Sequence, residues 1–133
     1  MREFAYRLHK GDDLKNIIAE LGKDGTYVVL SAVGCLSFLH IRLAKAKDEL
    51  SIGEDFEIIS LNGTIANGKC HLHIGVSDEK GHCLGGHLLE GNIVNTTCEL
   101  VLGKLQEYDS CRTYDKETGY DEISFIKCHG GNE

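Results

Sequence analysis

The chain has 133 residues, of which 41% are hydrophobic and 26% are charged, so one folded domain with one hydrophobic core is expected across residues 1–133. Its 14 basic and 21 acidic residues give a formal net charge of −7, which disfavours direct binding to nucleic-acid phosphates. No apolar run is long enough to span a bilayer, and the first residues lack the apolar core of a secretory signal, so a cytoplasmic location without membrane contact is expected.

An amphipathic helix is predicted at about residues 12–22. Asp12 is placed to cap its N-terminus, and Gly22 is placed to end it in a left-handed conformation. Its apolar residues recur at the spacing of one helix face: Leu14, Ile17, Ile18 and Leu21. This single apolar stripe indicates that the helix packs against the rest of the domain through one side.

Most of the remaining chain has the β-branched, partly alternating composition of strands. Strands are predicted at residues 26–34, 36–44, 56–66, 69–77 and 82–91, with two short ones between 112 and 127. The apolar segment 93–105 could be a strand or a helix, and its β-branched residues favour a strand. Turns are predicted at Asn67-Gly68 and Thr118-Gly119, a loop at residues 44–55 and an unstructured end at residues 128–133. One main packed helix with a largely antiparallel β-sheet defines an α+β fold.

Three histidines follow a pattern that suits a metal ion. Residues i and i+2 of a strand point to the same face, so His71 and His73 present two imidazoles side by side. His87 comes from the next strand or its approach, after a tight turn and a glycine pair that lets the backbone come close. Three histidines without a fourth protein ligand match an open divalent-metal site, with Zn²⁺ first. Alternatively, these histidines form ordinary hydrogen bonds on a polar strand face.

Other candidate residues carry weaker signals. Glu90 closely follows the third histidine and is a candidate general base, although a solvent-exposed turn residue fits the sequence better. Arg42 could meet a carboxylate or another anion, and an edge position with its head in water explains it equally well. His40 could approach the three histidines in space, whereas His82 is expected to be exposed. The sequence contains no nucleophile-elbow, P-loop or dinucleotide-binding motif.

Several segments, taken in order, resemble the PPC domain family (plants and prokaryotes conserved). These segments are RLHKGDDLKNII, AVGCLSFLHIRLA, FEIISLNGTI, HLHIGVSDEKG, GGHLLEGNIVNTTCELVL and RTYDKETGYDEI, within about residues 2–126. The resemblance implies a helix packed on a largely antiparallel sheet, and assembly as a homotrimer. It also implies that His71, His73 and His87, which match the family's H-L-H and G-G-H-L motifs, hold a metal.

The resemblance bears on function in two further ways. Stand-alone prokaryotic members, which this chain resembles, carry a DNA-binding label but lack the AT-hook of plant members. The family's fold is also similar to that of acetolactate decarboxylase, a zinc enzyme whose metal is held by three histidines. This likeness suggests a metal acting as Lewis acid on a small keto or hydroxy acid, for which only Glu90 and Glu99 offer acid groups.

Three functions are therefore weighed. The first, which we favour, is a homotrimeric metal-binding module that takes a small anionic ligand or a protein partner. The second is a metal-dependent, lyase-like enzyme acting on a small keto or hydroxy acid. The third is a DNA-associated regulator that works through a partner, because the acid excess opposes direct contact with nucleic acid.

Overall fold

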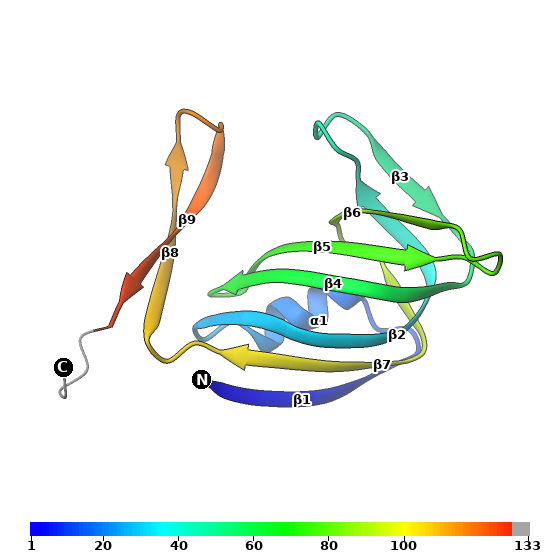
Figure 1. The fold of residues 1–133 in the computed structure, drawn as a ribbon, viewed down its shortest axis with the longest axis horizontal. Coiled ribbons are helices and arrows are strands. Elements are labelled where there is room, and N and C mark those ends of the chain that lie inside the picture. Colours follow the sequence, from blue (N-terminus) through cyan, green and yellow to red (C-terminus); the bar gives the residue numbers. More distant parts are fainter. Residues whose placement is uncertain (129–133) are drawn as a thin grey trace.

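The computed structural model describes residues 1–128, which form one helix and nine strands. In chain order these elements are β1 (Arg2–His9), α1 (Leu14–Leu21), β2 (Thr26–Arg42), β3 (Glu49–Ile52), β4 (Phe56–Ala66), β5 (Lys69–Ser77), β6 (Cys83–Leu88), β7 (Ile93–Lys104), β8 (Tyr108–Asp115) and β9 (Tyr120–Lys127). Seven strands form one antiparallel sheet with α1 against it, while β8 and β9 form a separate hairpin that stands away from this body (Figure 1). The predicted class, a largely antiparallel sheet with one packed helix, is confirmed.

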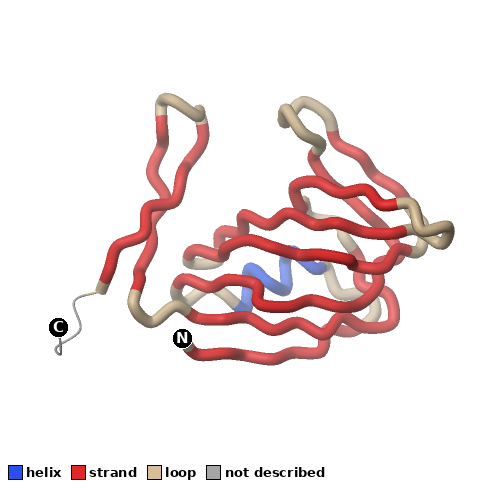
Figure 2. The backbone as a smooth tube through the Cα atoms, viewed as in Figure 1, coloured by secondary structure: helices blue, strands red, loops and turns tan. Residues whose placement is uncertain are grey.

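The large sheet curls back on itself because β2 is long and irregular. Its strand order is β1-β7-β2-β4-β5-β6, β3 pairs with β2, and the far end of β2 also pairs with β6. The register between β2 and β7 shifts at three points, and such bulges bend a strand. Strands β2, β4, β5 and β6 therefore close into a ring, and Figure 2 shows the single helix lying against the strands of the sheet.

The prediction of two strands at residues 26–34 and 36–44 is wrong, because β2 continues through Gly34. This glycine does not end a strand; a Cβ added to it would overlap the Thr97 carbonyl oxygen of β7. The predicted loop at residues 44–55 also contains a short strand, β3, in which Leu50 and Ile52 pack on the core between exposed polar neighbours. β1 is an element beyond the predicted ones, and the predicted unstructured end lies, apart from Cys128, outside the described residues.

The helix ends differ from the predicted caps. Asp13 rather than Asp12 caps α1, since the Asp13 carboxylate accepts from the Asn16 backbone N–H at 3.1 Å. Asp12 turns back and accepts from the His9 backbone N–H at 2.8 Å. Gly22 is not left-handed, with φ of −103°, and its N–H donates to a carbonyl of the last turn. Capping is therefore satisfied at both ends, with α1 shorter than predicted.

The core lies between α1 and the sheet. Leu14 and Ile18 of the predicted apolar stripe are completely buried there, which confirms the stripe. The alternation predicted for residues 69–77 is also confirmed, since three side chains of β5 are buried in the core: Leu72, Ile74 and Val76. His71 and His73 point to the opposite, exposed face. Core packing thus fixes β5 in place while leaving its other face free for chemistry.

Among the described residues, no helix has the length and apolar character needed to cross a membrane.

The β8–β9 hairpin is fixed to the body at its base. The Thr26 and Ser110 hydroxyls lie 2.6 Å apart in a buried contact, and the Asn67 side-chain amide donates to the Ser110 carbonyl. The predicted strands and turn of this segment are confirmed, with Gly119 at φ of +79°. Five large hydrophobic side chains of the hairpin are exposed: Tyr108, Tyr114, Tyr120, Phe125 and Ile126.

Gly63 of β4, the strand that pairs with β5, is expected to tolerate an added side chain poorly. It has φ of +143°, and a Cβ added to it would overlap the His71 carbonyl oxygen. We expect Gly63→Ala to lower the free energy of unfolding by about 2–4 kcal/mol in urea titrations, because backbone strain and overpacking add. Gly81→Ala is the control, since Gly81 also has positive φ but open space around it, and its cost should be about 1 kcal/mol. Equal losses in both variants would contradict the close strand spacing.

Candidate metal centre

Three histidines from two neighbouring strands meet on the exposed face of the sheet. His73 of β5 lies directly opposite His87 of β6 in the strand register, and His71 is two residues before His73. One ring nitrogen of each histidine lies within 4.8 Å of the other two. Nitrogens bound to one tetrahedral Zn²⁺ would be about 3.4 Å apart, given bond lengths of about 2.1 Å, so small ring rotations are enough to close on one ion. The structure thus brings together the three predicted site residues.

The glycine pair before His87 allows this convergence. A Cβ on Gly85 would overlap the Ile74 carbonyl of β5, and a Cβ on Gly86 would come against the Arg42 carbonyl of β2. β6 therefore fits tightly between β5 on one side and the end of β2 on the other. Larger side chains at either glycine would push β6 outwards, and His87 would move away from its two partners.

Two of the three histidines, His71 and His87, are held in the form that binds metals. Burial, and then the neighbouring Arg42 guanidinium, lower the pKa of His87 to about 4. Burial, His73 and Arg112 also lower the pKa of His71. Both rings are therefore neutral at pH 7, and the neutral imidazole is the ligand form. The buried Nδ1 of His87 has no hydrogen-bond partner, which costs free energy that a bound cation would offset, so the residues present fit a divalent metal ion.

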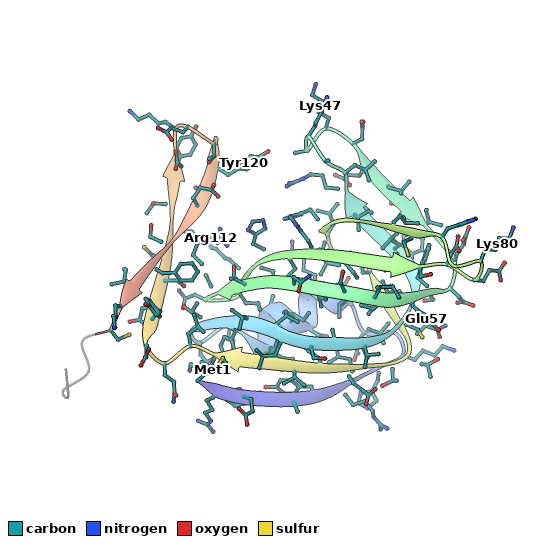
Figure 3. The ribbon with its side chains drawn as sticks, viewed as in Figure 1. Met1, Lys47, Glu57, Lys80, Arg112 and Tyr120 are labelled. Carbon is teal, nitrogen blue, oxygen red and sulfur yellow. The ribbon has the colours of Figure 1, made fainter. Side chains whose placement is uncertain are left out.

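The histidines line a cleft of about 1010 Å³ between the body and the β8–β9 hairpin. The hairpin contributes four residues to its wall: Arg112, Tyr120, Asp121 and Glu122. Figure 3 shows Arg112 and Tyr120 on the side of the hairpin that faces the body. The loop at residues 43–46 lines the cleft as well. A site in such an open cleft leaves room for water or a small ligand beside the three ring nitrogens, unlike a closed structural metal site.

The other candidates lie outside this group. Glu90 is exposed and does not line the cleft, and its backbone carbonyl accepts from His40 Nδ1 at 2.6 Å. His40 is also bonded to Glu49, at 2.7 Å, and does not join the three histidines. Glu99 is an exposed residue of β7, a strand that pairs with β1 and β2. His82 is exposed near the Asp78 carboxylate, as expected.

Two arginines complete the surroundings of the histidines. Arg42, for which two roles were open, lies directly opposite His87 where β2 pairs with β6. Arg112 reaches the cleft from β8 and was not among the predicted site residues. No local motif marks Arg112, because the hairpin approaches the body only in three dimensions. Arg42 could have been assigned to the site only from the pairing of β2 with β6. This pairing joins segments that are distant in the sequence, so no local pattern reveals it.

The fold and the site together define the class of this protein: an α+β domain with three histidines in an exposed cleft. Residues 1–106 match the sequence model of the Plants and Prokaryotes Conserved (PCC) domain, and the chain belongs to this family. This assignment confirms the resemblance seen in the sequence. The family assignment itself says nothing of metal content.

The chain also matches one part of two much longer proteins. A protein of Synechococcus sp. strain JA-3-3Ab, named bifunctional protein GlmU, is 37% identical over 130 residues. The match covers 96% of this chain but 21% of the relative. The chain therefore spans about a fifth of the length of that relative, and the match concerns one part of a larger protein.

Solved structures share the fold over nearly the whole chain. A hypothetical protein from Salmonella has a TM-score of 0.90 and 33% identity, covering 95% of this chain and 94% of its own. A protein from Bacteroides thetaiotaomicron, provisionally described as DNA-binding, has a TM-score of 0.81 and 25% identity, covering 92% of this chain and 91% of its own. A metal-containing protein from Archaeoglobus fulgidus has a TM-score of 0.70 and 25% identity, with 92% of each chain covered.

The lowered pKa of His87 predicts a specific loss of stability in acid. The unfolded chain takes up a proton on His87 near the ordinary pKa of 6.5, whereas the folded chain does so near 4. The free energy of unfolding should therefore fall as the pH decreases from 6.5 to 4, because the unfolded state binds more protons there. Urea titrations with a chelator at pH 7 and pH 5 should show a larger fall for the wild type than for His87→Gln. Equal falls would contradict the lowered pKa.

Proposed function

We propose that this chain is a metal-binding module in which His71, His73 and His87 hold one divalent cation, Zn²⁺ first, at the base of the cleft. The observation that carries the proposal is the convergence of the three ring nitrogens within 4.8 Å. Imidazole suits Zn²⁺, and the group contains no fourth His, Cys, Asp or Glu among the described residues. One coordination position would therefore stay open to a ligand. The metal-containing Archaeoglobus protein of the same fold supports the proposal.

The metal would serve binding rather than folding. The core packs on the other face of β5, away from the histidines, so its apolar contacts do not depend on an ion. We further propose a homotrimer, as the resemblance implied. The exposed apolar side chains of the hairpin, such as Tyr114 and Ile126, support it because a second copy could cover them. A cytoplasmic location belongs to the same proposal, since free thiols at Cys35, Cys70, Cys83, Cys98 and Cys111 suit a reducing compartment.

A metal-dependent enzyme is the second candidate. The open coordination position favours it, because a metal there could polarise the carbonyl of a small keto or hydroxy acid, by analogy with acetolactate decarboxylase. Such an enzyme also needs an acid or base beside the reacting atoms. Glu90 lies outside the cleft, so one of the two acidic residues that line it, Asp121 or Glu122, would have to take this role. A binding or regulatory module requires no such group and is therefore preferred.

Metal content tests the proposed function directly. Protein purified without a histidine tag is expected to contain about one zinc ion per chain by elemental analysis. His73→Ala should lose the metal, whereas His82→Ala should keep it, because His82 is an exposed histidine outside the group. Oligomeric mass measured in parallel should show three chains in all proteins, which separates the metal from assembly. A wild type without metal, even after dialysis against zinc, would refute the proposal.

Direct DNA binding is not part of the proposed function, although the family label suggests it. The chain has seven more acidic than basic residues, and an assembly of three would triple this excess. We expect no change in fluorescence anisotropy when an AT-rich duplex is titrated with the protein at low salt, since phosphates bind to basic surfaces. Saturable binding that weakens steeply with salt would show a basic surface in use, and would restore the family label for this chain.

A further inference from the structure

The cleft and the whole chain have opposite charge. The chain carries a formal net charge of −7. Four basic residues line the cleft, Arg42, Lys45, Lys69 and Arg112, against two acidic residues, Asp121 and Glu122. A cationic cleft in an acidic protein concentrates small anions against the average field of the surface.

Arg42 is a half-buried cation without a carboxylate partner. Its place opposite His87 is fixed by the pairing of β2 with β6. The guanidinium carbon lies 6.0 Å from the centre of the Tyr120 ring, which reaches across the cleft from the hairpin. Among the described residues, no carboxylate lies within salt-bridge distance of Arg42. Its donors therefore remain available to a ligand in the cleft.

Arg112 approaches the histidines from the other wall and is only partly satisfied. One of its terminal nitrogens, Nη1, donates to the Asp121 carbonyl at 3.0 Å, which fixes the guanidinium plane. The other, Nη2, is buried and has no hydrogen-bond partner within the described part of the chain. A buried donor of a charged group left without a partner is costly, so a ligand that accepts from it gains this energy on binding.

We infer that the cleft binds a small organic acid, whose carboxylate lies between Arg42 and Arg112. This inference rests on the proposed function, because the remaining oxygen of the ligand would reach the metal held by the three histidines. A planar guanidinium group can donate two parallel hydrogen bonds to the two oxygens of one carboxylate. The cleft also has apolar lining residues, Leu43, Ala44, Ala46 and Tyr120. This mixture of cationic and apolar walls suits a carboxylate with a short carbon skeleton better than inorganic phosphate.

Titration calorimetry with malonate, pyruvate and inorganic phosphate tests the inference on zinc-loaded protein. We expect malonate or pyruvate to bind the wild type more tightly than phosphate does. Arg42→Met and Arg112→Met should each weaken this binding about tenfold or more, because each removes charge-assisted hydrogen bonds. Arg7→Met is the matched control, since it removes the same charge from β1, outside the cleft, and its binding should equal that of the wild type.

Zinc content, measured on the same samples, separates this inference from the proposed function. Unchanged zinc in both cleft variants, together with weaker carboxylate binding, supports the inference. Equal binding in all four proteins, no binding to the zinc-loaded wild type, or tighter binding of phosphate would each overturn it while leaving the metal site in place. A wild type that holds no zinc would instead remove the proposed function, and the inference with it.

Discussion

The tight fit of β6 between β5 and the end of β2 is the constraint on which the site depends. Gly85 and Gly86 have no side chain to hold these strands apart, and carbonyl groups of both neighbours occupy the space that a Cβ would need. Because β6 contacts both strands, His87 lies opposite His73 on one side and opposite Arg42 on the other. One short strand thus determines both the histidine group and the cation beside it.

The bent strand β2 links this site to the hydrophobic core. Its first half pairs with β4 and β7, and its last residues pair with β6 and β3. Leu36, Leu39 and Ile41 are completely buried, so packing holds the end of the strand firmly. Arg42 follows directly and points to the face that carries the histidines. Packing energy from the core therefore positions a polar group that contributes nothing to the core itself.

Local patterns in the sequence were enough to predict the parts of the fold that depend on neighbouring residues. The alternation of residues 69–77, the apolar stripe of the helix and the Asn67-Gly68 turn are all as predicted. Gly34 misled the strand prediction because a glycine that ends a strand and a glycine that admits a neighbouring strand look alike in sequence. Arg112 could not be predicted, since its place depends on how the hairpin stands against the body.

The charges around the histidines link the binding of the metal to the binding of the anion. Arg42 contributes to the low pKa of His87, so the potential at this ring is positive. Burial is the larger cause of the low pKa, and the positive potential adds to it; this potential also opposes a divalent cation at the ring nitrogen. A carboxylate between Arg42 and Arg112 would neutralise part of this charge and thereby favour the metal. By linkage, a metal in the site would favour the carboxylate to the same extent, so the two should bind with positive coupling. The guanidinium groups would then lower metal affinity in the free protein and make it depend on the ligand.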